Sequence, residues 1–129
     1  MITTSPETSR TDIEAVLRSA KVSVDLAMQS MSDPGIHQIL ADLAKQGIKI
    51  RMVLGGAGRI PENAVLARAL ESAGMEVGIS DKPYIHAKVL IVDGLTVYLG
   101  SVNFTTPGFD ENREVGILFE NREIAQRIS

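Results

Sequence analysis

An imidazole and an amine stand two residues apart in an otherwise apolar stretch of the sequence. His86 and Lys88 belong to the run from Tyr84 to Val92, whose composition predicts a strand. Because successive side chains of a strand point to opposite faces, His86 and Lys88 would share one face, and the apolar residues between them would pack into a core on the other. Burying such a polar pair is costly without a purpose. The pair suits a phosphate, because it sets a positive charge beside a group that can act as nucleophile or proton carrier.

Two further groups of polar side chains follow where strands should end or begin. Asp93-Gly94 predicts a tight hairpin turn, so that the return strand from Thr96 to Leu99 runs beside the first. The residues that this return strand delivers are Gly100, Ser101 and Asn103. After a turn-rich loop over 105–111, Asn112 and Glu114 stand two residues apart at the start of a third predicted strand. We therefore expect all these groups to lie near one another.

The spacing of these residues resembles the signature of the phospholipase D superfamily, H-x-K-x(4)-D-x(6)-G-S-x-N. The matching residues, without a spacing error, are His86, Lys88, Asp93, Gly100, Ser101 and Asn103. The family's downstream Asn and Glu are similar to Asn112 and Glu114. Six fixed positions would match by chance on the order of once in ten million starting points. The resemblance implies an α/β fold, a phospholipase D-like layered sandwich in which a mixed β-sheet is flanked by helices, as one half-unit that pairs with a second.

The resemblance also implies candidate site residues. The candidate catalytic residues are His86, Lys88, Asp93, Ser101, Asn103 and Glu114, and the candidate substrate-binding residues are Lys88, Ser101, Asn103 and Asn112. By resemblance, His86 would form a phosphohistidine, and Glu114 would bond its other ring nitrogen and fix the tautomer. Lys88 and Asn103 would hold the phosphoryl oxygens, with Ser101 in support. Asp93 belongs to the signature, but its place at the turn favours a structural role. The family's mechanism needs no cofactor and no metal.

The same chemistry needs a second histidine as general acid, and the chain has only one other. His37 lies early in a predicted helix, with no Lys two residues on and no Ser/Asn partner loop, and is interpreted as a surface or helix-face residue. The family pairs two signatures about a two-fold axis. We therefore expect a homodimer whose two His86 side chains share one site, or a second signature half in a longer chain.

The rest of the chain predicts alternating helices and strands, which favours a layered α/β sheet. Helices are expected from the capping box Thr11-x-x-Glu14, after Asp33 as N-cap, and from Pro61. Strands are expected over 21–28, 48–54 and 75–79. The glycine-rich stretch 55–58 fits neither the dinucleotide fingerprint nor the Walker pattern, so a flexible connection is favoured over a phosphate cradle.

Length and composition bound these expectations. The 129 residues, 13.9 kDa, predict a single phospholipase D-like domain over 1–129, with a polar lead-in over 1–10 and a helix from Arg122 that Ser129 cuts short. There is no cysteine, so disulfides and thiolate metal sites are excluded. No stretch is long enough for a transmembrane span, and no secretory signal is visible, so a cytoplasmic location is expected.

Three functions remain open. The favoured one is a phospholipid head-group phosphodiesterase, acting by hydrolysis or transfer. The net charge of −3 counts against a nucleic-acid binder, although Arg59, Lys88 and Arg113 could line a groove. The run from Asn112 to Gly116 also resembles the phospholipase and cardiolipin-synthase branches. The alternative is a homodimeric, metal-independent endonuclease that cuts DNA or RNA. The third is an inactive scaffold that kept the fold.

Overall fold

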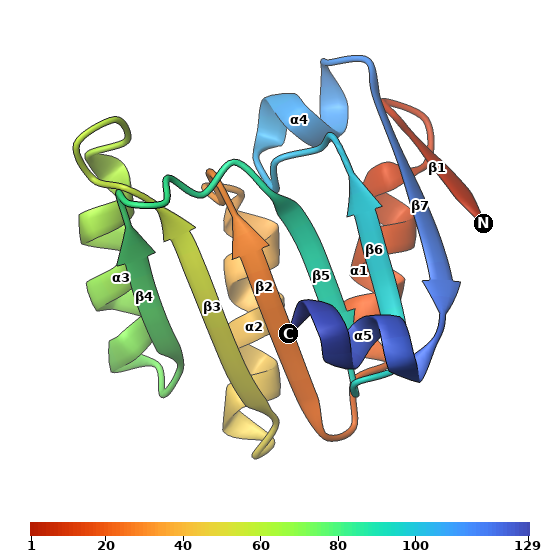
Figure 1. The fold of residues 1–129 in the computed structure, drawn as a ribbon, viewed down its shortest axis with the longest axis horizontal. Helices are drawn as coiled ribbons and strands as arrows, with labels where there is room; N and C mark the ends of the chain where they lie inside the picture. The colour runs from red at the N-terminus through yellow and green to blue at the C-terminus, as the bar shows by residue number, and fades with distance from the viewer.

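The structure is a computed structural model that describes all 129 residues (Figure 1). The strands are β1 (Ile2–Ser5), β2 (Ser23–Met28), β3 (Lys49–Gly55), β4 (Glu76–Ser80), β5 (Lys88–Val92), β6 (Thr96–Gly100) and β7 (Glu114–Glu120). The helices are α1 (Ser9–Arg18), α2 (Pro34–Lys45), α3 (Glu62–Ser72), α4 (Thr106–Asp110) and α5 (Arg122–Ile128). The mixed sheet with flanking helices confirms the predicted α/β sandwich.

The seven strands form one sheet in the order β1-β7-β6-β5-β2-β3-β4. β2, β3 and β4 are parallel, whereas β5, β6, β7 and β1 alternate in direction from β2 outward. The carboxyl ends of β2, β3 and β6 therefore meet the amino ends of β5 and β7 at one edge, which is the upper edge in Figure 1. This edge is called the site edge below.

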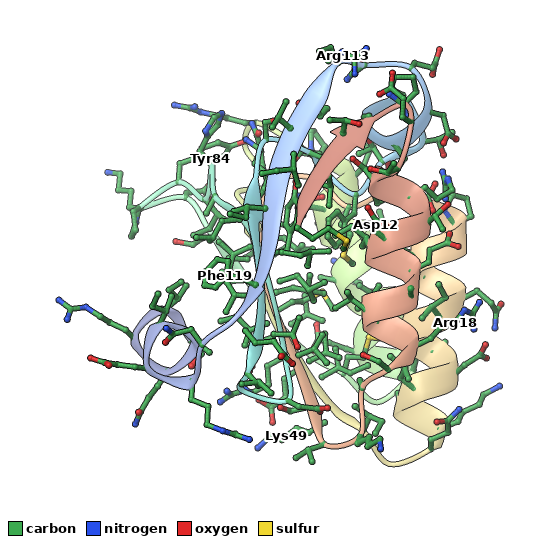
Figure 2. All side chains as sticks on the ribbon, turned by 90° about the vertical axis from the view of Figure 1, so that its right-hand side faces the viewer. Asp12, Arg18, Lys49, Tyr84, Arg113 and Phe119 are labelled. Atoms are coloured by element: carbon green, nitrogen blue, oxygen red, sulfur yellow. The ribbon has the colours of Figure 1, made fainter.

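Helices α1, α2 and α3 cover one face of the sheet, and α5 lies on the other (Figure 1, Figure 2). The main core lies under α1 and α2, where alternate residues of β2 and β5, such as Leu26 and Leu90, are buried. A smaller cluster of Ile91, Val97 and Ala125 lies under α5. Helix α5 (seven residues) covers only part of this face of the sheet, and Val115 and Ile117 of β7 are 53% and 41% exposed.

The predicted strand around His86 is wrong in two respects. β5 begins at Lys88, so His86 lies in the irregular segment that precedes it. The expected core face was also too simple, because Leu90 and Val92 on the face of Lys88 are buried in the main core, while Ile91 on the other face packs against α5. Both faces of β5 are covered, which explains why its sequence is a continuous apolar run.

Three other elements differ from the predictions. The expected polar lead-in contains strand β1, whose Thr3 and Ser5 are buried by antiparallel pairing with β7. Helix α1 begins at Ser9, without a side-chain cap. The expected loop after Asn103 contains α4, where the Thr105 hydroxyl accepts a hydrogen bond from the Gly108 N–H. By contrast, Asp33 caps α2 as predicted, through a 3.1 Å bond from the Ile36 N–H, and no helix is long and apolar enough to cross a membrane.

Candidate active site

His86 and Lys88 meet at the site edge, at the amino end of β5. The Lys88 ammonium donates to the His86 carbonyl oxygen at 2.8 Å and lies 3.4 Å from His86 Nε2. The imidazole is exposed, so it is open to a substrate. The structure thus brings the predicted imidazole and amine together, although through an irregular segment rather than through a shared strand face.

Partial burial of the Lys88 side chain lowers its pKa, and the negative charge of Glu114 opposes that shift. Burial is the larger effect, because Lys88 is half-buried two residues before the buried Leu90 and loses part of its hydration there. The charge of Glu114 reaches it from the far side of β6, since β6 separates β5 from β7 in the sheet. Lys88 is therefore a partly dehydrated cation, a state in which an ammonium attracts an anion more strongly than in water.

Ser101, Asn112 and Glu114 form the second part of the site, at the neighbouring strand ends. Glu114 opens β7, and its carboxylate accepts from the Ser101 hydroxyl at 2.7 Å and from the Asn112 amide at 3.4 Å. The Ser101 hydroxyl in turn accepts from the Val115 N–H at 3.0 Å. Glu114 makes no hydrogen bond to His86, in contrast to the contact that the family resemblance implies. The carboxylate is held ready at the edge by two donors while the imidazole is turned to Lys88.

Asn103 is tied to β2 rather than to its own hairpin. Its side-chain oxygen accepts from the Ser30 N–H at 3.2 Å, just beyond the end of β2. This leaves the amide NH₂ group without a protein partner and available as a donor to a phosphoryl oxygen. Sequence reasoning gave no sign of Ser30, because a backbone donor has no residue signature.

A buried ion pair anchors the loop that carries Asn103. Asp33, 2% exposed, accepts from the Arg10 guanidinium at 2.8 and 3.0 Å and from the Thr106 hydroxyl at 2.9 Å. Its backbone N–H donates to the Phe104 carbonyl at 3.0 Å. Burial raises the pKa of Asp33, but the hydrogen bonds from Arg10, Thr106 and the Ile36 N–H outweigh burial and hold that pKa below its ordinary value.

The glycine of the signature has a packing role. A Cβ added to Gly100 would lie 2.3 Å from the Tyr98 hydroxyl oxygen, and one added to Gly116, its cross-strand partner, would lie 2.3 Å from the Tyr98 ring. The two glycines therefore make room for the fully buried Tyr98 ring on the helix-covered face. This lets β6 and β7 bring Ser101 and Glu114 into contact.

Asp93 lies at the other end of β5, roughly 16 Å along the strand from Lys88. Its carboxylate accepts from the backbone N–H groups of Lys21, Val22 and Ser23 at 2.7 to 3.1 Å. Asp93 and Gly94 both have positive φ, 57° and 62°, as a tight hairpin turn requires. Burial raises the pKa of Asp93, but the bonds from these backbone N–H groups outweigh burial and lower it overall. Of the candidate residues, Asp93 is the one that the structure does not bring to the site edge.

His37 and Arg113, the other groups considered from the sequence, are engaged elsewhere. His37 lies on α2, where its Nε2 contacts the Met31 carbonyl oxygen. Arg113 binds the Glu7 carboxylate at 2.6 and 3.0 Å. No group of three or more His, Cys, Asp or Glu side chains is placed to hold a metal ion.

Comparisons with known proteins show the family of the chain. The family described as "Cardiolipin synthase, PLD-like domain" matches residues 13–129. Phospholipase D of Rickettsia felis is 33% identical over 108 residues, 83% of this chain and 54% of that protein. Human mitochondrial cardiolipin hydrolase is 31% identical over 108 residues, 83% of this chain and 42% of that protein. The chain thus spans about half the length of these relatives.

Solved structures show the same fold. Nuc from Salmonella typhimurium, a phospholipase D family member, superposes with a TM-score of 0.89 at 28% identity, covering 99% of this chain and 87% of that one. NucT from Helicobacter pylori superposes with a TM-score of 0.86 at 20% identity, covering 99% and 89%. The similarity therefore extends over the whole sheet and its helices.

Proposed function

The chain belongs to the phospholipase D-like family, and from this premise we propose that it is a metal-independent phosphodiesterase acting on a phospholipid head-group diester. The observation that carries the proposal is the meeting of His86, Lys88, Ser101, Asn112 and Glu114 at one sheet edge. These residues come from three segments of the chain and have no common structural task there. Catalysis explains their convergence better than folding does.

The chemistry is a double displacement at phosphorus. A ring nitrogen of His86 attacks the phosphorus, a nitrogen–phosphorus bond forms, and the ester oxygen leaves with a proton from a general acid. Water, or an alcohol in a transfer reaction, then attacks the phosphohistidine, gives its proton back to that group and frees His86. Lys88 and the free amide of Asn103 stabilise the charge on the non-bridging oxygens.

Glu114 orients the nucleophile in this proposal. His86 is exposed and held only by Lys88, so its ring can turn when a phosphate binds the Lys88 ammonium. The carboxylate of Glu114, fixed by Ser101 and Asn112, can then accept from the ring N–H and set the tautomer. Hydrogen bonds at a catalytic site are often incomplete before substrate binds.

The general acid comes from a second copy of the site. His37 lies on α2 and its Nε2 is engaged by the Met31 carbonyl oxygen, so it is not proposed as the acid. We therefore propose a homodimer, or pairing with another signature half, in which two His86 equivalents face one substrate. This pairing follows the family's arrangement of two signatures about a two-fold axis, as the resemblance implies.

The second candidate is an endonuclease that uses the same residues on DNA or RNA. The exposed Arg59, which forms no salt bridge, favours it. The net charge of −3 and the pairing of Arg113 with Glu7 count against it, because a nucleic-acid groove needs several free cations along its length. An inactive scaffold is disfavoured by the intact set of side chains.

The test is a substrate panel in the presence of EDTA, with wild type beside His86→Ala. Vesicles of phosphatidylcholine or cardiolipin, duplex DNA, single-stranded DNA and RNA are each offered. We expect head-group release that His86→Ala abolishes. The covalent bond between protein and phosphorus should be acid-labile, as in phosphohistidine, and no acid-stable, alkali-sensitive bond should form. Nucleic-acid cutting alone would support the endonuclease, and a folded dimer that turns over nothing would support the scaffold.

A further inference from the structure

Helix α4, at the upper edge in Figure 1, lies in the chain between the two halves of the site. It begins three residues after Asn103, and its last turn continues to Asn112, whose N–H donates to the Pro107 carbonyl oxygen at 2.9 Å. The Asn112 side chain in turn contacts Glu114. A helix of five residues is marginal by itself, so its position depends on contacts with the rest of the fold. The place of α4 therefore affects both Asn103 and Glu114.

The Arg10 guanidinium, in the first turn of α1, holds the far end of α4. Its Nε and Nη2 donate to the two carboxylate oxygens of Asp110, the last residue of α4, at 3.0 Å each. Its Nη1 and Nη2 donate to Asp33 at 3.0 and 2.8 Å, and Nη1 also donates to Glu14 at 3.3 Å. An arginine has five N–H donors, and each of them here has a carboxylate acceptor. The Arg10 Cζ atom also lies 4.9 Å from the centroid of the buried Phe109 ring of α4.

The same cluster holds the start of α4. Thr106, the first residue of the helix, donates to the Asp33 carboxylate at 2.9 Å. The Asp33 N–H donates at 3.0 Å to the carbonyl oxygen of Phe104, which directly follows Asn103. Arg10 therefore holds α4 at both ends, through Asp33 at its start and directly at its end.

This cluster requires an arginine rather than any cation. Three carboxylates, those of Glu14, Asp33 and Asp110, face one guanidinium, which binds the two aspartates through paired N–H donors. The hydrogen bonds with Asp33 and then with Asp110 raise the pKa of Arg10 and outweigh partial burial, so the side chain stays charged. A lysine carries the same charge on a compact ammonium, which cannot bind two carboxylates in this paired geometry. Arg10→Lys should therefore keep the charge and release one end of α4.

We propose that Arg10 is a positioning residue for the reaction, which acts through α4 to place the Asn103 amide and the Glu114 carboxylate. Arg10 precedes residues 13–129, which the family model matches, so this role is not part of the signature. The inference rests on the proposed function, because that function assigns the phosphoryl oxygens to Asn103 and the imidazole ring to Glu114.

The first test compares kcat and KM of Arg10→Lys with those of wild type on phosphatidylcholine and cardiolipin vesicles. We expect kcat to fall roughly ten- to hundredfold and KM to change less than about threefold, because misplaced groups weaken interactions made in the transition state. Asp110→Asn, which weakens only one end of α4, should lower kcat less than Arg10→Lys does. Arg18→Lys is the matched control and should behave as wild type, since Arg18 is exposed on the same helix and forms no salt bridge.

A double-mutant cycle shows whether Arg10 acts through Asn103. In the Asn103→Ala background, the factor by which Arg10→Lys lowers kcat should be at least about three times smaller than in wild type, because the amide that Arg10 positions is already gone. Losses that multiply independently would overturn the proposal. So would a kcat of Arg10→Lys within about twofold of wild type.

Hydrogen exchange followed by NMR separates this inference from the proposed function, because it needs no turnover. The Ser30 N–H donates to the Asn103 side-chain oxygen, so its exchange rate reports whether that side chain is in place. Arg10→Lys should speed exchange at Ser30 roughly tenfold or more, while the N–H of Leu90, in the central strand β5, stays as in wild type. If wild type cleaves nothing, this result still supports the positioning of Asn103 by Arg10. Unchanged exchange at Ser30, or equal acceleration at Leu90, would overturn it.

Discussion

Replacing Asp93 tests whether a signature residue serves the fold or the reaction. In Asp93→Ala, three backbone N–H groups at the start of β2 lose their acceptor, and a residue at φ 57° loses a side chain that tolerates this conformation. Each lost hydrogen bond should lower the free energy of unfolding by about 1 kcal/mol, which is less than for buried charged partners because the site is partly exposed. The three together cost about 3 kcal/mol. Asp93→Asn keeps one side-chain oxygen and should cost about half as much.

Urea unfolding measures this cost directly. With a slope near 1.5 kcal/mol per molar, Asp93→Ala should lower the midpoint by about 2 M. Because the pKa of Asp93 is lowered in the folded chain, its stabilisation is complete above its ordinary pKa of 3.8 and is lost as pH falls through the lowered value. Stability should therefore fall less steeply below pH 4 in Asp93→Asn than in wild type.

Activity decides between the two roles. At a temperature where Asp93→Asn is fully folded, it should keep kcat within about threefold of wild type, because Asp93 lies at the far end of β5. A drop of a hundredfold or more in kcat, with an unchanged urea midpoint, would refute the structural role and place the carboxylate in the reaction. Glu114→Gln is the comparison, since it should lose activity while its urea midpoint changes little.

Three other substitutions have defined outcomes. Gly100→Ala should destabilise the chain by about 1–3 kcal/mol in urea unfolding, because its methyl group overlaps the buried Tyr98 side chain; an unchanged midpoint would contradict that packing. Asp33→Asn should cost about 2–4 kcal/mol in thermal unfolding, because it leaves the Arg10 guanidinium without its buried partner; a cost below 0.5 kcal/mol would show that the ion pair does not hold the loop. Because burial lowers the pKa of Lys88, the rate should begin to fall at a pH below the ordinary lysine pKa of 10.5 as the pH rises. In a pH–rate profile, Lys88→Arg should move this alkaline loss of activity to higher pH.

The sequence predicted the residues of the site better than their contacts. The spacing predicted neighbouring strand ends for His86, Lys88, Ser101 and Glu114, because a hairpin and the strand after it leave these residues few possible positions in a sheet. It could not predict that Glu114 is held by Ser101 and Asn112 while His86 turns to Lys88. Such choices depend on side-chain rotamers, which a spacing pattern does not contain.

Long-range pairing accounts for the features that were missed. Arg10 and Asp110 are a hundred residues apart, yet their side chains join at 3.0 Å, and nothing in either local sequence indicates this. β1 was missed because Thr3 and Ser5 are polar, and only pairing with β7 buries them.

The fit of Tyr98 between Gly100 and Gly116 has a consequence for descendants of this domain. A copy that lost His86, and with it catalysis, would still need both glycines for as long as it kept the tyrosine. Tyr98 and the two glycines should be substituted together or retained together in evolution, whether or not the domain is catalytically active. Both glycines at these positions would therefore indicate a shared fold, whereas the reacting side chains, His86 first among them, would indicate activity.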